Sequence, residues 1–559
     1  MDDVDAVQAQ IARNMLESGD WVTARLDGVA YLEKAPLKYW MIAVSYMIFG
    51  VHDWAARIPV ALAAILLAWV TCRFAAWAFS EAAGLVAGLA VATSVGLFLF
   101  TRILIPDVIL TLAITTAMWS LLRALDEAER HPRLWALLLA VSIACGLLLK
   151  GLIAPLFICG GAGLYLLFTR QLFSMRTWKR LSPASGVAVI LLIAAPWHVL
   201  ATLRNPPYFD FTMRSEPGAY HGFFWFYFLN EHVFRFLNMR YPRDYNTVPR
   251  ALFWLLHLVW LFPWSVFFPA AARLSYKPVD RAGRARLLAL CWTGFLLVFF
   301  TFSTTQEYYS MPCYPALALL VGSAVAREGA WIKGGYRTVS VIAAAAAVVT
   351  AALLFLVRNV PAPGDISVAL TQNPEVYTLS LGHMRDLTLK SFAYLRTPLA
   401  FASAAFLVGV IGAWRLQGRR AALALAVMMV MFAHAARLAL VAFDPYLSSR
   451  PLAEALRRAP EGRLIVDDQY YTFSSVFFYT NRRALLLNGR VNNLEYGSYA
   501  PGAPKVFIDD RDFQRLWGSS ERLYLTAAST ALARLEGLVG RAALCEVASA
   551  GGKYLFTNR

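Results

Sequence analysis

Apolar runs of about twenty residues recur along most of this chain, and no other feature constrains its fold as strongly. Each run is close to the length with which an α-helix crosses the hydrocarbon core of a bilayer. Only 16% of the residues are charged, whereas soluble domains average about 25%. The pattern predicts a polytopic α-helical membrane protein with about twelve transmembrane helices. We expect them near residues 56–79, 82–105, 108–125, 134–150, 152–168, 182–201, 251–271, 287–304, 309–326, 339–356, 399–416 and 421–443.

The formal net charge of +17 is explained by where the basic residues lie. In a soluble protein this excess would favour nucleic-acid binding. Here arginines and lysines cluster in alternate loops, and such loops stay on the cytoplasmic side of a membrane. The clusters fall at residues 123–133, 170–180, 273–286, 327–337 and 415–420. We therefore expect no nucleic-acid partner, and we place the remaining loops and the C-terminal tail outside the cytoplasm.

The tail of the chain predicts a small α/β domain of about 100 residues. Its short apolar segments have the length of buried strands, and helical stretches such as residues 529–538 separate them. The expected strands are residues 464–466, 484–487, 506–508 and 523–525. We thus expect a first outer loop with amphipathic and juxtamembrane helices at 1–55, a transmembrane domain at 56–445 with an outer loop at 202–250, and a periplasmic α/β domain at 446–559. Within the first loop, residues 7–18 suggest an amphipathic helix on the bilayer surface.

Asp107 is the most informative single residue, because it follows Pro106 at the start of a predicted span. A carboxylate at the mouth of a span is costly unless it faces a cavity or a partner, so such residues are commonly functional. Aspartate also caps helices well, and a structural role as an N-cap is compatible with a functional one. We treat Asp107 as a candidate catalytic residue.

Other acidic residues lie on the same predicted side of the membrane. Asp2 and Asp3 could act as general bases or metal ligands, or they could belong to a solvated terminus. Glu33 and Lys34 stand just before a short apolar segment at residues 36–49. A lysine in that position commonly extends toward the membrane interface, which is the simpler explanation for Lys34.

The outer loop at residues 202–250 is rich in arginine on the side of a membrane that is usually poor in it. Long translocated loops are partly exempt from the charge rule, so the excess alone is not proof of a ligand. Arginine nevertheless binds phosphate bidentately, which makes Arg235 and Arg240 candidates for an anionic ligand. His221 and His232 are single histidines, structural or ligating, and neither belongs to an HExxH pattern.

Together these residues predict a membrane-embedded site for a lipid-linked phosphate. Carboxylates would deprotonate or orient an acceptor, and basic residues would hold the departing phosphate. A transporter or flippase of lipid-linked sugars would need the same spans and the same phosphate cluster but no base. The charged residues gather at one face rather than at mid-span, and no internal repeat is evident, which favours chemistry over passage. A structural scaffold would leave the acidic residues unexplained.

Several longer motifs resemble a known family. The first loop contains MLESGDW, LEKAPLKYW and ARIP; TRILIPD surrounds Asp107, NEHVFRF surrounds His232, and EYYSMPCYPALALL surrounds Tyr309. This combination resembles the bacterial aminoarabinose transferases, which are GT-C membrane glycosyltransferases related to the protein O-mannosyltransferases. FYTNR and LEYG in the tail are also similar, so the resemblance covers most of the chain.

The resemblance implies an inverting transfer of a sugar from undecaprenyl phosphate to an acceptor on the periplasmic side of the bacterial inner membrane. The best-known acceptor is the lipid A phosphate, with other lipids, glycans and proteins as alternatives, and no nucleotide cofactor is implied. The catalytic residues implied are Asp107 and one of Asp2 and Asp3. The ligand positions implied are Lys34, Arg235 and Tyr309 for the carrier phosphate, and Glu33 and His232 for a divalent metal, zinc or magnesium.

The chain departs from the family pattern at three places. A transmembrane helix usually precedes the acidic motif, whereas this sequence begins at the motif, so we expect that a first helix is missing. The spacing from Asp2 and Asp3 to Met15 is longer than usual, which leaves open which aspartate is catalytic. Ala35 stands where proline is common, and the lysine often found before Tyr309 is absent.

Overall fold

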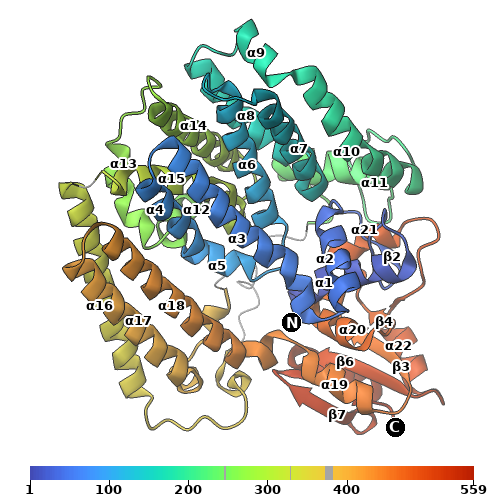
Figure 1. The fold of residues 1–559 in the computed structure, drawn as a ribbon. Coiled ribbons are helices and arrows are strands. Elements are labelled where there is room, and N and C mark those ends of the chain that lie inside the picture. Colours follow the sequence, from blue (N-terminus) through green and yellow to red (C-terminus); the bar gives the residue numbers. More distant parts are fainter. Residues whose placement is uncertain (244–246, 328, 372–381) are drawn as a thin grey trace.

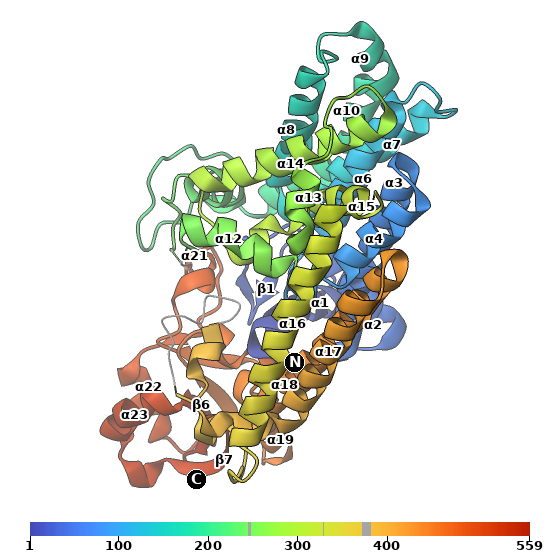
Figure 2. The same ribbon diagram turned by 90° about the vertical axis from the view of Figure 1, so that its left-hand side faces the viewer.

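The computed structural model describes residues 1–243, 247–327, 329–371 and 382–559, and most of them are helical. Long helices form the larger part of the molecule, and a small mixed sheet lies at the C-terminal end (Figure 1). The basic segment α9 (Met175–Leu181) lies at the opposite end of the molecule from this sheet (Figure 2). This arrangement agrees with basic loops on one side of a membrane and the tail on the other.

Eight helical segments in the described part of the chain are long and apolar enough to cross a membrane. They are α3 (Asp53–Ala78), α6 (Asp107–Leu125), α7 (Pro132–Lys150), α9 with α10 (Met175–Arg204), α14 (Arg281–Phe302), α16 (Ala330–Leu356), α17 with its preceding turn (Lys390–Arg415) and α18 (Gly418–Leu447). Two bent pairs raise the number to ten. These pairs are α4 (Glu81–Ala92) with α5 (Val95–Thr101), and α12 (Arg250–Trp260) with the segment Trp264–Ala272.

The polytopic helical fold is therefore confirmed: in the described residues ten of the twelve predicted positions are helices or bent pairs that meet this criterion, and the other two are shorter helices. At two predicted positions the helices are α8 (Ile153–Phe168) and α15 (Tyr314–Val325), with 16 and 12 residues. At 1.5 Å per residue they are about 24 and 18 Å long, less than the roughly 30 Å of a hydrocarbon core. The apolar runs in the sequence continue through a turn or a 3₁₀ segment, so they overstate the length of the helix.

Small residues bring α3 and α4 into close contact. A Cβ atom added at Gly88 would lie 2.8 Å from the Cβ atom of Cys72, and one at Gly84 would lie 2.8 Å from that of Ala76. Close approach of backbones through glycine and alanine is a common way to pack helices in a membrane, where lipid tails remove the hydrophobic advantage of larger residues.

The first helix, α1 (Asp3–Ser18), is buried rather than spread on a bilayer surface as the sequence suggested. Ala6, Val7, Ala9 and Ile11 are fully buried, and α1 packs against both α2 (Leu37–Phe49) and α20 (Ser474–Thr480). An amphipathic pattern shows that one face is apolar, but it does not distinguish lipid from protein as the covering partner. Between α1 and α2, β1 (Arg25–Leu26) and β2 (Val29–Ala30) form a short hairpin.

The C-terminal domain contains a six-stranded sheet in the order β5-β4-β3-β6-β8-β7. The strands are β3 (Arg463–Asp467), β4 (Ala484–Leu487), β5 (Phe507–Ile508), β6 (Leu523–Ala528), β7 (Cys545–Ala550) and β8 (Lys553–Thr557). The first four are parallel, and β8 and β7 complete the sheet in antiparallel pairing. The small α/β domain is thus confirmed. Strands β7 and β8 were not predicted; β7 is a largely exposed edge strand without the apolar run that identified the others.

Candidate functional site

A cavity of about 350 Å³ opens where α6, α7, α8 and the segment around Trp225–Phe234 meet. One part of its wall is polar and contains Glu33, Lys34, Asp107, Lys150, Glu231, His232, Arg235 and Tyr309. The other part is apolar and includes Leu152, Leu156, Phe157 and Phe299. Leu152 and Leu156 are also 43% and 40% exposed on the surface of the helical bundle. The cavity therefore suits a ligand with a charged head and an apolar chain that continues into the membrane.

Asp107 lies in the cavity wall at the first turn of α6, and it is almost completely buried. Its carboxylate accepts a hydrogen bond from Lys150 at 2.5 Å. Lys150 is the last residue of α7 and was not identified from the sequence, where it resembles an ordinary basic residue at the end of a span. Its ammonium group also lies 4.6 Å from the ring centre of Tyr309. A buried carboxylate is costly without a partner, and Lys150 is that partner.

A second group of charges surrounds Glu33 and Glu231. Lys34 donates to Glu33 at 2.6 Å, and Arg235 donates to Glu231 at 2.7 Å. Arg240 joins the two carboxylates, since it donates to Glu231 and lies 3.5 Å from Glu33. Burial would raise the pKa of Glu33, but the charges of Lys34, Arg240 and Arg235 outweigh it and lower the pKa to about 2. Both glutamates are therefore ionised, and the network keeps four charged groups at the cavity wall.

Arg240 was predicted to bind phosphate, but it does not lie in the cavity wall. Its side chain is only 1% exposed, and Glu231 and the carbonyl of Pro242 hold its guanidinium group. It is not among the residues that line the cavity, whereas Lys34, Arg235 and Tyr309 are. The structure therefore places Arg240 behind Glu231, where it supports the wall.

Glu231 and His232 belong to a π-helix over Trp225–Phe234. Segments of π-helix are rare and occur frequently at functional sites, because the extra residue in each turn redirects side chains. In His232, Nδ1 lies 2.6 Å from the carbonyl oxygen of Tyr227, and Nε2 accepts the N–H of Leu152 at 3.0 Å. Burial lowers the pKa of His232, so the ring is neutral in this environment.

This geometry provides no preformed site for the divalent metal that was predicted at Glu33 and His232. Both ring nitrogens of His232 already have partners, and Glu33 is bound by cations. In the part of the chain that the structure describes, no group of three or more His, Cys, Asp and Glu side chains is arranged to hold a metal ion. The metal site stays a prediction, and the reaction that we propose has no step through a metal.

Asp2 and Asp3, the predicted catalytic pair, lie outside the cavity wall. Asp3 accepts hydrogen bonds from Lys553 at 2.5 Å and from the Ser449 hydroxyl at 2.8 Å, both close to the C-terminal sheet. Asp2 forms ion pairs of 3.7 and 3.5 Å with Arg57 and Arg102. The structure thus gives Asp3 a role in attaching α1 to the C-terminal domain, whereas Asp2 lies beside Arg102 in the segment that precedes Asp107.

Asp5 and Lys38, for which no role was predicted from the sequence, fix the segment that leads to Asp107. The backbone N–H of Leu104 donates to Asp5 at 2.8 Å, and the carbonyl of the same residue accepts from Lys38 at 3.0 Å. Arg57 donates both to Asp5 and to the carbonyl of Arg102. Burial and the neighbouring Asp2 raise the pKa of Asp5 to about 7, and burial lowers the pKa of Lys38 to about 7.

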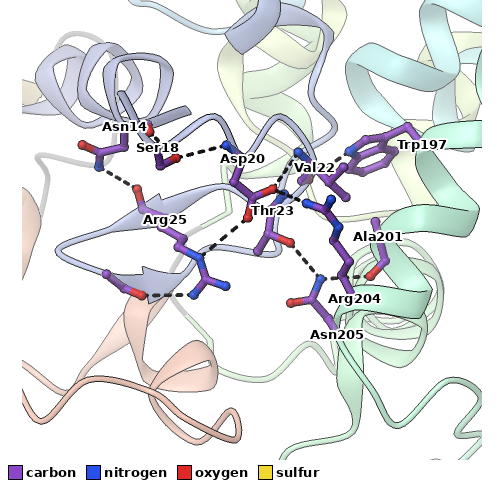
Figure 3. A network of polar contacts seen from close by, with 11 residues as sticks. Asn14, Ser18, Asp20, Val22, Thr23, Arg25, Trp197, Ala201, Arg204 and Asn205 are labelled. Carbon is purple, nitrogen blue, oxygen red and sulfur yellow. Dashed lines mark hydrogen bonds and ion pairs between the residues drawn. The ribbon is translucent and has the colours of Figure 1, made fainter. Parts of the chain in front are cut away.

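The SGDW motif of the first loop has a structural role. Asp20 accepts backbone N–H groups of Val22 and Thr23 at 3.1 Å each, and it pairs with Arg204 at 2.7 Å (Figure 3). Trp197 donates to the carbonyl of Val22, so the loop is joined to the end of α10 at two places (Figure 3). One of the arginines of the outer loop is therefore explained by packing rather than by an anionic ligand.

Known proteins are similar to this chain in sequence. A family model described as dolichyl-phosphate-mannose-protein mannosyltransferase matches residues 33–199. An undecaprenyl phosphate-alpha-4-amino-4-deoxy-L-arabinose arabinosyl transferase of Aeromonas salmonicida is 28% identical over 58% of this chain and 58% of its own length. The chain thus spans less than two thirds of that relative. Proteins of the same name are similar in Pseudomonas aeruginosa (30% identical, 57% of this chain, 54% of the relative) and Erwinia tasmaniensis (25%, 92% and 86%).

Among solved structures, ArnT from Cupriavidus metallidurans bound to undecaprenyl phosphate superimposes with a TM-score of 0.77. The match covers 99% of this chain and 93% of that chain at 24% identity. The apo form of the same protein gives a TM-score of 0.76 over 100% of this chain and 93% of that chain, at 23% identity. The resemblance to the aminoarabinose transferases is therefore confirmed, and the chain is a multi-pass membrane protein with the GT-C fold of these structures.

Proposed function

We propose that this protein is an inverting membrane glycosyltransferase that takes its sugar from a polyprenyl-phosphate carrier. The observation that carries the proposal is one cavity that joins Lys34, Lys150 and Arg235 with the carboxylate of Asp107 and with an apolar wall. The names of the relatives and the undecaprenyl phosphate bound to the Cupriavidus protein support the same substrate class.

The cations of the cavity would hold the phosphate of the carrier. Arginine and lysine form strong, charge-assisted hydrogen bonds with phosphate oxygens, and the polyprenyl chain would lie along Leu152, Leu156 and the aromatic residues beside them. In the structure Lys150 is paired with Asp107. An incoming phosphate would compete for the same ammonium group, and this competition would release Asp107 when the donor is in place.

The reaction is a single displacement at the anomeric carbon of the sugar. An acceptor oxygen forms a new bond to that carbon while the bond to the carrier phosphate breaks, and the phosphate leaves with the bonding electron pair. Asp107 accepts the proton of an acceptor hydroxyl, or orients an acceptor that carries no proton. Lys34, Lys150 and Arg235 stabilise the charge that develops on the departing phosphate.

The cluster of Asp5, Lys38 and Arg57 has a positioning role in this proposal. Its contacts to the backbone of Arg102 and Leu104 fix the segment directly before Asp107. Transfer reactions depend steeply on geometry, so a small displacement of Asp107 would lower the rate.

The acceptor is a lipid of the lipid A type in this proposal, and the cavity faces the periplasm of the bacterial inner membrane. The side assignment rests on the basic loops, which lie away from the C-terminal domain. The family model for residues 33–199 favours one second candidate, in which a protein hydroxyl accepts the sugar. The main alternative that is not an enzyme is a flippase of lipid-linked sugars. It would use the same cations but would not form a glycosidic bond.

Mass spectrometry of lipid extracts from cells with and without the gene tests the proposal. We expect a lipid-linked sugar to accumulate in the deletion strain while one modified lipid disappears. Accumulation with an unchanged lipid profile would favour a protein or glycan acceptor. An unchanged pool of lipid-linked sugars together with unchanged acceptors would refute a transferase role.

A further inference from the structure

A second cavity, of about 330 Å³, lies in the C-terminal domain. Its wall contains Asp467, Asp468, Asn488, Thr530, Arg534 and Phe473. None of these residues takes part in the transferase site described above. The volume is at the lower end of the range for small-molecule sites in proteins.

The position of this cavity in the sheet is one where α/β proteins bind ligands. Asp467 ends β3 and Asn488 directly follows β4, whereas Thr530 and Arg534 follow β6. All three strands are parallel, so these residues meet at the carboxyl edge of the sheet. The chain continues from β3 to β4 and β5 on one side, and then returns to place β6 on the other side of β3. The cavity thus lies at a topological switch point, where open parallel sheets leave a crevice.

Carboxylates outnumber cations around the cavity. Arg534 donates to both Asp467 and Asp510, and the latter also accepts from Asn488 at 2.8 Å. Asp467 is buried, with a side chain only 4% exposed, whereas Asp468 is exposed at the cavity. One guanidinium group therefore faces three carboxylates, and its charge is already shared between two of them.

This balance restricts the class of ligand. The excess of carboxylates repels phosphates and other anions. In the described residues these carboxylates do not form a group that could hold a metal ion. What remains complementary is a small molecule that donates several hydrogen bonds and has an apolar edge to place on Ala528 and Ala531, which are partly exposed in the cavity wall.

We propose that this cavity binds a saccharide unit, either neutral or bearing an ammonium group. The hydroxyl groups of the ring would donate to Asp467 and Asp468 and exchange hydrogen bonds with Asn488 and Thr530, and a C–H edge would contact Ala528 and Ala531. An ammonium group on the ring would strengthen binding through the carboxylates. The site is separate from the cavity at Asp107 and does not depend on the proposed transfer reaction.

The test uses the full-length protein in nanodiscs and soluble probes. Binding of methyl glucosaminide, methyl glucoside and glucose 1-phosphate is measured by saturation-transfer NMR and titration calorimetry. We expect the glucosaminide to bind best, the glucoside more weakly and the sugar phosphate least. Asp468→Asn should weaken glucosaminide binding about tenfold, because it removes a charged acceptor, and Asn488→Ala should weaken it several-fold.

Two control variants separate this site from other effects. Asp512→Asn alters an exposed carboxylate of α22 (Asp510–Trp517) outside the cavity wall, and it should leave binding unchanged. Asp107→Asn should also bind the probe normally, which distinguishes this site from the transferase cavity. Competition by a lipid-anchored glucosaminide in the nanodisc would identify a membrane glycolipid as the source of the saccharide, and competition by the soluble form alone would identify a free glycan. Absence of saturable binding, insensitivity to Asp468→Asn, or preference for the sugar phosphate would overturn the proposal.

Discussion

Replacement of Arg240 by methionine should destabilise the protein in a manner that depends on pH. Arg240 joins the carboxylates of Glu33 and Glu231, and all three side chains are nearly inaccessible to solvent. Methionine has a similar length but no charge, so Arg240→Met leaves two buried carboxylates without their shared partner. Breaking a buried ion pair by removal of one member typically costs about 3–5 kcal/mol.

The pKa of Glu33 gives an independent magnitude for the stability that the neighbouring cations provide. Its fall from 4.5 to about 2 corresponds to roughly 3 kcal/mol of stability, shared among Lys34, Arg240 and Arg235. Because the folded-state pKa is depressed, this contribution is present above pH 4.5 and is lost as the pH falls through about 2. The Arg240→Met defect should therefore be largest near neutral pH, and it should shrink toward about pH 4, where carboxylates that have lost one of their cations begin to take up protons.

Chemical denaturation of the purified protein in detergent, followed by tryptophan fluorescence at several pH values, measures this effect. Arg240→Lys should lose less stability than Arg240→Met, because it keeps a positive charge beside the two carboxylates. Arg243→Met is the matched control: it alters an exposed arginine of the same segment and should have little effect on stability. If Arg240→Met keeps wild-type stability at neutral pH and weakens only the binding of undecaprenyl phosphate, Arg240 is a phosphate ligand and the structural argument is wrong.

Three further results are expected. Lys34→Ala should weaken the binding of undecaprenyl phosphate at least about tenfold in a calorimetric titration, through loss of a charge-assisted hydrogen bond; unchanged affinity would exclude contact with the phosphate. Asp5→Ala should lower kcat about tenfold with little change in donor affinity, because it removes the acceptor of the Leu104 N–H and so loosens the backbone there; a change in KM alone would contradict the positioning role. Arg204→Ala should cost less than about 1 kcal/mol in the same denaturation assay, because its ion pair with Asp20 is half exposed; a larger loss, or a loss of donor binding, would assign it another role.

Much of the charged end of the cavity was predictable from the sequence. Asp107 was predicted because a carboxylate at the mouth of a span is costly unless it faces a cavity or a partner. Lys34, Arg235 and Tyr309 were predicted from motifs of the family that the sequence resembles. The structure places all four in one wall. Lys150 was missed because a basic residue at the end of an apolar run is normally explained by the membrane interface.

The role of the first acidic residues could not be obtained from spacing alone. Asp2, Asp3 and Asp5 stand within one turn of α1, and only the packing of that helix decides which carboxylate meets which partner. Asp3 faces Lys553, which is 550 residues away in the chain, and Asp5 faces the backbone of Leu104. Contacts of this separation leave no local pattern in a sequence. The same reason explains why α1 was assigned to the bilayer surface instead of to the C-terminal domain.

A transfer assay with purified protein in liposomes tests the central claim most directly. Undecaprenyl-phosphate sugar and lipid A are supplied together, and mass spectrometry measures the glycosylated acceptor and the released undecaprenyl phosphate. We expect wild type to form both products in equal amounts, and Asp107→Asn to form them at least about a hundredfold more slowly while still binding undecaprenyl phosphate. Equal rates for the two proteins would contradict the catalytic role of Asp107, and movement of the intact donor across the membrane without a new glycosidic bond would show a flippase instead.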